Sequence, residues 1–217
     1  GGVGLTRTMW LYCVRHGESV HNAEGRIQGQ ADIPLSDFGR RQGEAIAAAL
    51  AELPIDAIYA SPLLRALETA QIVARRLSLP IRIDARLKEI HIGVFQNRLR
   101  SEVAELYPEA FARWTAGEPD YAVPGGESRR ALQERGAAAF REIAAAGREH
   151  AAIIAHGRLL AVTLEAFVPV PAGPATPSLE NASITTVRCD GDGCWELTAY
   201  NQVDHLRDVG LSGAGDL

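Results

Sequence analysis

Four short segments of the chain carry residue types suited to phosphate chemistry. Arg15 and His16 stand side by side, and Arg65, Glu89 and His156 follow at wide intervals. Two guanidinium groups can hold a tetrahedral anion through forked hydrogen bonds. A histidine beside such cations is driven towards its neutral, nucleophilic form, and a nearby carboxyl group can protonate a leaving alkoxide. Together these residue types indicate phosphoryl transfer through a phosphohistidine.

Each of these residues also has an ordinary structural explanation. An arginine most often caps a helix or forms a surface ion pair, and a single histidine at a strand end is usually structural. Glu89 beside Lys88 suits a solvated pair, and the Arg-His-Gly tripeptide of residues 15–17 is by itself a weak signal. The functional interpretation therefore depends on the coincidence of suitable residues at successive strand ends.

Strands and helices alternate through most of the chain. Apolar runs predict strands at residues 10–14, 56–60, 81–83 and 151–155, followed by a hairpin at 183–189 and 194–200. The expected helices cover residues 37–51, 61–77, 98–114 with a break at Pro108, 127–146 and 157–167, while residues 168–177 are expected to be irregular. This alternation predicts an α/β fold, with a sheet that has helices on both faces.

Each group of polar residues comes directly after a predicted strand. Ligands of open α/β sheets bind outside the carboxyl ends of the strands, so we expect these groups to converge on one place. Gly17 and Gly157 let the backbone approach a ligand closely, and a helix that begins after Gly157 favours anions. In chain order, the strand at 10–14 precedes Arg15 and His16, the strand at 56–60 precedes Arg65, the strand at 81–83 precedes Glu89, and the strand at 151–155 precedes His156.

Length and composition exclude several broad classes of protein. The 217 residues suit one domain spanning 1–217, with a core at about 9–207. The net charge of -5 disfavours a nucleic-acid binder, whose phosphate contacts need a basic surface. We expect no membrane association, because no apolar run is long enough to span a bilayer. With no secretory signal visible at the start of the chain, a cytoplasmic protein is expected.

The same segments match, in chain order, the motifs of a known family. Over about residues 9–207 the chain resembles the histidine phosphatase superfamily, in the branch that includes the cofactor-dependent phosphoglycerate mutases. The matching motifs are residues 11–19 with Asn22, 28–29, 34–39, 61–65 with Thr69 and Ala70, 87–93, 124–128, 155–157, 181–183 and 200–206.

This resemblance implies a fold, an activity and a role for each matching residue. The fold would be a three-layer α/β/α sandwich around a central, mostly parallel sheet. The activity would be hydrolysis of small phosphorylated metabolites, with no metal and no cofactor. His16 would carry the phosphoryl group, Arg15, Arg65 and His156 would hold its oxygens, and Glu89 would act first as general acid and then as general base. Asn22 would add a neutral donor, Gln28 would contact the substrate, and Gly157 would line its site.

Three positions depart from the family pattern, and all of them fall where substrate contacts are expected. Residues 95–97 read Phe-Gln-Asn where the family often has Trp-Glu-Gly. His21 replaces a common aromatic residue, and Arg158 stands where small residues are frequent. Phosphoglycerates, sugar phosphates, nucleotides and phosphoproteins therefore all stay open as natural substrates.

Three other functions compete with hydrolysis. A phosphoglycerate mutase would use the same pocket, but family mutases carry a longer segment between the glutamate and the second histidine. A non-catalytic phospho-ligand binding or regulatory module would usually have lost His16 or Glu89, and both are present. A metal hydrolase using the histidines, with His21 and His91 among them, lacks a two-histidine helical spacing and partner carboxylates. The oligomeric state stays open, with a homodimer as one option.

Overall fold

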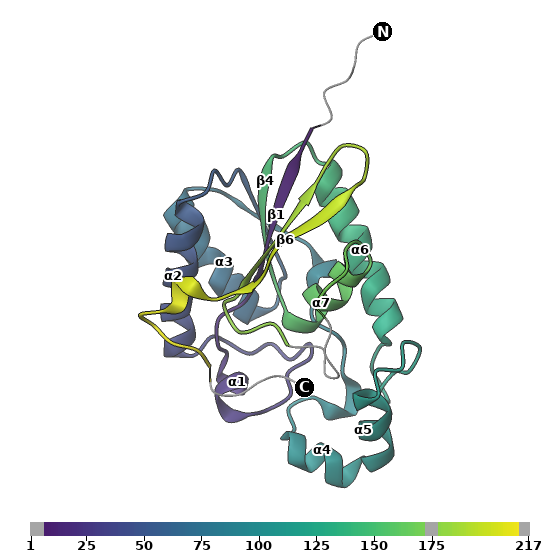
Figure 1. Ribbon diagram of the computed structural model, residues 1–217. Coiled ribbons are helices and arrows are strands. Elements are labelled where there is room, and N and C mark those ends of the chain that lie inside the picture. The colour runs from purple at the N-terminus through teal and green to yellow at the C-terminus, as the bar shows by residue number, and fades with distance from the viewer. Residues whose placement is uncertain (1–6, 172–177, 213–217) are drawn as a thin grey trace.

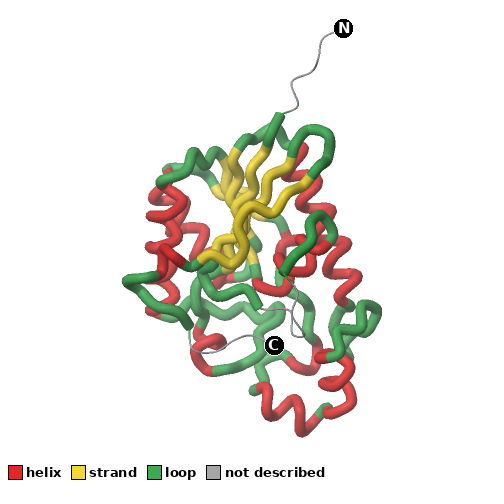
Figure 2. The backbone as a smooth tube through the Cα atoms, in the orientation of Figure 1, coloured by secondary structure: helices red, strands yellow, loops and turns green. Residues whose placement is uncertain are grey.

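Six strands form one mixed sheet, in the order β3-β2-β4-β1-β5-β6. The computed structural model describes residues 7–171 and 178–212. Figure 2 shows the strands at the centre of the molecule, with helices on either side. The strands are β1 (Met9–Arg15), β2 (Ala57–Ala60), β3 (Ile81–Ile83), β4 (His150–Ala155), β5 (Ile184–Cys189) and β6 (Trp195–Gln202).

The strands from β3 to β1 run parallel, and the hairpin of β5 and β6 adds an antiparallel edge. The prediction of a mostly parallel sheet is therefore confirmed. In the central pair β1 and β4, Arg15 stands opposite Ala155. The next residues along the two strands are His16 and His156, so this register delivers both histidines to the same edge of the sheet.

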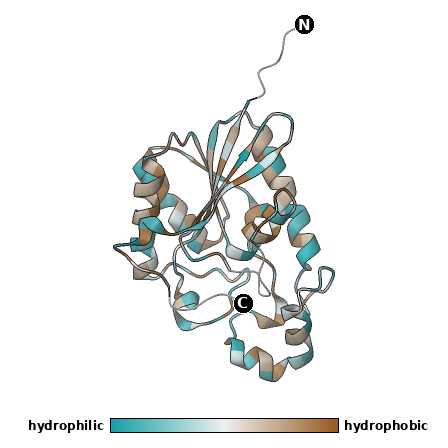
Figure 3. Cartoon of the chain, viewed as in Figure 1, coloured by the Kyte–Doolittle hydropathy of each residue, from teal (hydrophilic) through white to brown (hydrophobic). Residues whose placement is uncertain are grey.

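Helices cover both faces of the sheet (Figure 1), which confirms the predicted three-layer sandwich. The helices α2 (Asp37–Ala51) and α3 (Leu64–Leu77) lie on one face, and α6 (Arg129–Ala145) and α7 (Gly157–Glu165) lie on the other. In Figure 3 the ribbons of these helices carry both hydrophilic and hydrophobic residues. Each helix turns its apolar side to the sheet, as expected for an amphipathic surface helix.

The central strand β1 is buried on both faces, which explains why its sequence is a continuous apolar run. Leu11 and Cys13 belong to the apolar cluster under α6 and α7, whereas Tyr12 and Val14 belong to the cluster under α2 and α3. Successive side chains of a strand point to opposite faces, so a strand between two helix layers needs apolar residues at every position.

The remaining helices gather at the end of the sheet opposite the N-terminus, at the bottom of Figure 1. These are α1 (Val20–Glu24), α4 (Arg100–Leu106) and α5 (Pro108–Thr115). The predicted break at Pro108 is confirmed, although the first of the two helices begins at residue 100 rather than 98. Three short 3₁₀ turns complete the described chain: η1 (Ala85–Leu87), η2 (Gly93–Phe95) and η3 (Asp204–Leu206).

Three further predicted helix boundaries were wrong by a few residues, and one helix was missed. Helix α3 begins at Leu64 rather than at Ser61, because the Ser61 side chain accepts a hydrogen bond from the Leu63 N–H and holds a turn. Helix α6 begins at residue 129 after its Ser128 cap, and α7 ends at residue 165 rather than 167. The missed helix is α1, whose Ser19 and Asn22 form a capping box.

Residues 168–171 are irregular, as predicted, and residues 172–177 lie outside the described part of the chain. Within the described residues, none of the helices combines the length and the apolar character that crossing a bilayer requires.

Candidate active site

A cavity lies beyond the carboxyl ends of the parallel strands, where open α/β sheets bind their ligands. Its volume is about 760 Å³, including the open solvent at its mouth. Polar residues from separate segments meet there, as the strand-end argument predicts. The predicted site residues that line the cavity are Arg15, His16, Gln28, Arg65, Glu89 and Gly157.

His16 follows β1 directly, and it is 1% exposed. Its main chain is fixed to the sheet, because its N–H donates to the Ala155 carbonyl at 3.1 Å and its carbonyl accepts from the Ala182 N–H at 3.0 Å. Nδ1 of the ring lies 2.6 Å from the Gly17 carbonyl, which only accepts, so Nδ1 carries the hydrogen. Nε of Arg65 donates to Nε2 at 3.3 Å. Both contacts assign the neutral tautomer with its lone pair on Nε2.

The pKa of His16 lies well below its ordinary value. Burial is the largest cause, because the charged imidazolium would lose its hydration. The positive charges of Arg65 and Arg15 lower the pKa further, and the hydrogen bond to Gly17 opposes them only in part. The ring is therefore neutral at neutral pH, with a nucleophilic nitrogen at the cavity wall.

Arg15 and Arg65 bring two buried guanidinium groups to this wall, with 2% and 1% of each residue exposed. Arg65 comes from the first turn of α3 and donates to the carbonyls of Gly29 at 2.6 Å and Ala31 at 2.7 Å. Arg15 ends β1 and donates to the Leu179 carbonyl. Backbone acceptors thus fix both side chains, so the positive charge at the site is preorganised.

Gly157 allows Arg15 to lie against the start of α7. A Cβ atom at this position would stand 3.2 Å from both Cδ and Nε of Arg15, which is tighter than an ordinary contact. Any larger residue would press on the Arg15 side chain, so Gly157 is needed for the guanidinium of Arg15 to lie in this position.

His156 stands behind the cavity rather than in its lining, and it faces His16 edge-on with ring centroids 5.2 Å apart. Its Nε2 lies 2.8 Å from Oγ of Ser61. Its Nδ1 is buried and has no hydrogen-bond partner within the described residues. Burial first, and then the charge of Arg65, holds the pKa of His156 well below its ordinary value. An unpaired buried nitrogen costs about 1–3 kcal/mol, so this position favours a bound polar ligand.

Glu89 lies at the cavity edge and points its carboxyl group at the start of α7. Oε1 accepts from the N–H groups of Ile90 at 2.8 Å and Leu159 at 2.9 Å, and Oε2 accepts from the Arg158 N–H at 3.0 Å. The first N–H groups of a helix lack intrahelical partners, so a carboxylate satisfies them well. These contacts fix the carboxyl group beside the arginines of the cavity.

Asn22 and Gln28 belong to a buried polar network around the His16 loop. Oγ of Ser19 lies 3.0 Å from Oδ1 of Asn22 and also contacts Oε1 of Gln28. Asn181 donates to Oδ1 of Asn22 at 3.1 Å and to the His16 carbonyl at 3.3 Å. Gln28 lines the cavity, whereas Asn22 does not. Asn22 therefore supports the loop, and its contact with phosphate stays a prediction.

Several residues that complete the site had been matched to motifs without being given a role. Thr69 accepts from the Gly17 N–H at 3.2 Å, and Ser61 holds His156. Asn181 was one of these residues too. Their position within the matched motifs was the available signal, but the sequence alone did not say what each side chain touches.

Two further cavity residues, Trp114 and Arg129, were not assigned to the site, and Arg158 was placed where substrate contacts are expected but was given no role. Trp114 comes from α5, and Arg129 and Arg158 come from the first turns of α6 and α7. The guanidinium of Arg158 lies over the Trp114 ring, 4.8 Å from its centroid. Trp114 and Arg129 follow no strand, so an argument from strand ends could not find them.

The histidines outside the cavity have other partners. Nε2 of His21 lies 2.9 Å from Oδ1 of Asn97, and Nδ1 of His91 accepts from the Gly93 N–H at 3.2 Å. In residues 7–171 and 178–212, no three or more His, Cys, Asp or Glu side chains are grouped so that they could hold a metal ion.

Comparison with known proteins agrees with this geometry. The model of the histidine phosphatase superfamily (branch 1) matches residues 11–203. Phosphoglycerate mutase-like protein 4 of Arabidopsis thaliana is 34% identical, with 94% of this chain and 90% of that protein covered. The metal-independent phosphoserine phosphatase of the same plant is 35% identical, with 94% of this chain and 86% of that protein covered.

A solved structure is similar over nearly the whole chain. The native structure of mycobacterial glucosyl-3-phosphoglycerate phosphatase superposes with a TM-score of 0.82 at 30% sequence identity. The match covers 91% of this chain and 100% of that one.

Proposed function

The chain belongs to the histidine phosphatase superfamily, and on that premise we propose that it hydrolyses small phosphomonoesters through a phosphohistidine on His16. The observation that carries this proposal is the state of His16. Its ring is neutral, Nδ1 is held by the Gly17 carbonyl, and Nε2 is left as the only nucleophilic nitrogen. Nucleophilic catalysis requires a group prepared in this way.

In the first step, Nε2 of His16 attacks phosphorus while the bond from phosphorus to the ester oxygen breaks. Arg15 and Arg65 stabilise the charge that spreads over the phosphoryl oxygens. The family resemblance implies a further donor in His156, which stands behind the cavity lining and whose buried Nδ1 has no partner within the described residues. Since guanidinium groups supply the positive charge, the step needs no metal ion. Glu89 gives its proton to the departing alkoxide, which leaves as an alcohol.

In the second step, water attacks the phosphohistidine. Glu89, now a carboxylate, takes a proton from this water as the bond between nitrogen and phosphorus breaks. Inorganic phosphate leaves, His16 returns to its neutral form, and Glu89 again carries its proton. The cycle therefore consumes one water per ester and restores every group.

The charge of the cavity favours one kind of small phosphorylated substrate. Among the described residues that line it, four are arginines (Arg15, Arg65, Arg129 and Arg158) and one, Glu89, is acidic; Arg129 also lies 3.9 Å from Glu165. A phosphomonoester brings roughly two negative charges at neutral pH. A substrate with a second anionic group near its ester would match the excess of arginines over carboxyl groups in this lining.

The test is a phosphate-release screen over phosphoglycerates, sugar phosphates and nucleotides, with p-nitrophenyl phosphate included. We expect release that depends on His16, so the His16→Ala protein serves as the blank. Equal release by both proteins would reject the proposal.

A further inference from the structure

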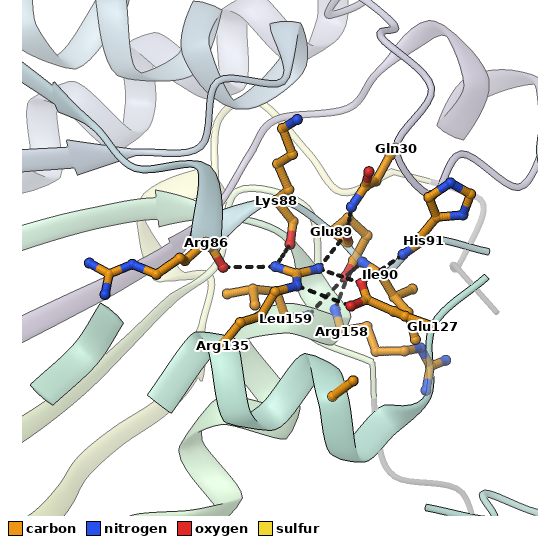
Figure 4. Close-up of polar contacts among 12 residues, drawn as sticks. Gln30, Arg86, Lys88, Glu89, Ile90, His91, Glu127, Arg135, Arg158 and Leu159 are labelled. Carbon is orange, nitrogen blue, oxygen red and sulfur yellow. Dashed lines mark hydrogen bonds and ion pairs between the residues drawn. The ribbon is translucent and has the colours of Figure 1, made fainter. Parts of the chain in front are cut away.

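Arg135 of α6 holds the main chain of the segment that carries Glu89 (Figure 4). Its Nη1 donates to the carbonyls of Arg86 at 2.7 Å and Lys88 at 2.6 Å, and its Nη2 donates to the Glu89 carbonyl at 2.9 Å. One guanidinium thus gathers three carbonyl groups of four consecutive residues. Residues 86–89 include the end of the 3₁₀ turn η1 but no part of a helix or strand. The hydrogen bonds from Arg135 therefore bind carbonyl groups that a helix or a strand would otherwise satisfy.

The other donors of Arg135 meet Glu127. Nη2 lies 2.6 Å from Oε1 and Nε lies 3.2 Å from Oε2, in a forked pair. Oε1 of Glu127 also accepts from the His91 N–H at 2.9 Å, and the Glu127 N–H donates to the His91 carbonyl at 2.9 Å. The five N–H donors of the guanidinium therefore have five acceptors. The pair of Arg135 and Glu127 therefore binds the main chain both before Glu89, at residues 86 and 88, and after it, at residue 91.

This pair differs from the surface ion pairs of the chain. The side chains of Arg135 and Glu127 are 21% and 20% exposed, whereas those of Arg130 and Asp120 are 54% and 76% exposed. Exposed pairs contribute little because water and salt screen them. A forked pair that is mostly shielded from water holds its geometry much more firmly.

Helix α6 is itself held against α7, whose N–H groups bind the Glu89 carboxyl. A Cβ atom at Gly136 would stand 1.9 Å from Oγ1 of Thr163, so only glycine allows the two helices to approach this closely. Gln133 donates to the Val162 carbonyl at 2.9 Å across the same contact. The main chain of Glu89 is therefore held by α6, its carboxyl group is held by α7, and these two helices are packed closely together.

We propose that Arg135 is a positioning residue for Glu89, which acts by holding residues 86–91 so that the carboxyl group stays at the leaving-group side of the cavity. This inference rests on the proposed function, because it assigns Arg135 to the proton-transfer step of that reaction. Arg135 does not line the cavity. Its effect must therefore pass through Glu89.

A matched pair of substrates separates this role from a general role in folding. Phenyl phosphate and p-nitrophenyl phosphate have nearly the same shape, but phenoxide is a much poorer leaving group and needs a proton more. Loss of a general acid costs about 10²–10⁴-fold where protonation is needed. We therefore expect Arg135→Met to lower kcat/KM at least about tenfold more on phenyl phosphate than on p-nitrophenyl phosphate. Arg135→Lys should change the ratio in the same direction, because an ammonium group cannot reproduce the fork.

The decisive comparison repeats Arg135→Met in a Glu89→Gln background. If Arg135 acts only through Glu89, removing it there should leave the substrate ratio unchanged, because coupled residues do not contribute additively. If Arg135→Met changed the ratio of the two kcat/KM values in the Glu89→Gln background as much as it does in the wild type, the proposal would be overturned. An equal loss on both substrates in the single variant would overturn it as well.

Two further variants keep the test informative. Arg130→Met removes a neighbouring ion pair on the same helix and should leave both kcat/KM values and the melting temperature near those of the wild type. If Arg135→Met does not fold, Arg135→Lys and Glu127→Gln carry the same comparison, with melting curves to confirm that each is folded. Failure of the proposed function would look different, since the wild type would then not hydrolyse p-nitrophenyl phosphate, or His16→Ala would hydrolyse it equally well.

Discussion

Nε of Arg65 donates to Nε2 of His16 across 3.3 Å, so the ring nitrogen that has the lone pair faces a guanidinium group. A phosphoryl group that bonds to Nε2 would find this positive charge beside its oxygens. The same charge lowers the pKa of His16 and keeps the ring neutral. In the proposed mechanism, one arginine would thus both keep the nucleophile neutral and stabilise the phosphoryl group that it attacks.

His16→Ala should abolish turnover, by roughly 10⁴-fold or more, because the described site offers no second nucleophile in the same position. Wild-type protein exposed to a ³²P-labelled ester should carry label that is labile in acid and stable in base. His91→Ala is the control, since His91 is exposed and does not line the cavity. Normal turnover in His16→Ala would contradict the mechanism.

Exhaustive chelation should leave activity unchanged, because in the proposed mechanism Arg15 and Arg65, which line the cavity, supply the positive charge that a phosphate needs. The measurement is p-nitrophenyl phosphate hydrolysis before and after EDTA treatment and dialysis. Loss of activity that added divalent ions restore would favour a metal mechanism instead.

Hydrolysis should outpace phosphoryl transfer to a second hydroxyl. A mutase must keep water from its phosphohistidine, whereas only the short helices α4 and α5 and the loop after them lie between η2 and α6. With 3-phosphoglycerate, we expect release of inorganic phosphate that does not depend on 2,3-bisphosphoglycerate. Phosphate and 2-phosphoglycerate are measured in one reaction. Bisphosphoglycerate-dependent formation of 2-phosphoglycerate faster than phosphate release would reverse the assignment.

The free energy of unfolding should fall as the pH drops below about 6.5. Unfolded histidines take up a proton there, whereas buried His16 and His156 stay neutral because their pKa values are lowered. The unfolded state then binds more protons, and stability falls by up to about 1.4 kcal/mol per pH unit for each such histidine. Above about pH 7.5 both states are neutral and the effect vanishes.

Urea unfolding between about pH 7.5 and about pH 5.5 measures this effect, and variants isolate it from the titration of carboxyl groups. His156→Asn removes one of the two titrating rings, so its stability should depend less steeply on pH than that of the wild type. Parallel curves for the two proteins would show that the pKa of His156 is not lowered.

Arg158 should select ligands with a second anionic group. The phosphonates 3-phosphonopropionate and propylphosphonate differ by a carboxylate in place of a methyl group, and both can be measured as inhibitors of p-nitrophenyl phosphate hydrolysis. We expect the carboxylate to improve the inhibition constant of the wild type about tenfold, or roughly 1.4 kcal/mol, and Arg158→Met to remove most of this gain. Arg130→Met should keep it. An unchanged preference in Arg158→Met would show that the cavity binds the second group elsewhere or not at all.

The sheet and the convergence of the strand-end residues were predictable from sequence, because both depend on local pattern. An apolar run followed by Arg15 and His16 specifies a buried strand and the group that it delivers. The family resemblance added the roles, which the residue types alone left open. Helix α1 was missed although Ser19 and Asn22 carry a capping signal, because five residues are too few for a visible periodicity.

The pair of Arg135 and Glu127 was beyond sequence reasoning for a different reason. Arg135 occupies an unremarkable position in an alanine-rich helix, and its partners are carbonyl groups, which every residue possesses. Only the packing of α6 against residues 86–89 shows which carbonyl groups it meets. Trp114 is a similar case, since its place over Arg158 depends on how α5 folds back across the cavity.

Because of the register of β1 against β4, the appearance of enzymatic activity should report that these two strands have paired correctly. Arg15 pairs with Ala155 across a contact between distant parts of the chain, and the two histidines are the next residues on each strand. A slip of one residue would turn every side chain of a strand to the opposite face of the sheet, so the two histidines would no longer face each other. A mispaired chain is therefore expected to be fully inactive rather than partly active. During refolding, the first hydrolysed ester would mark the moment at which this one long-range pairing closes.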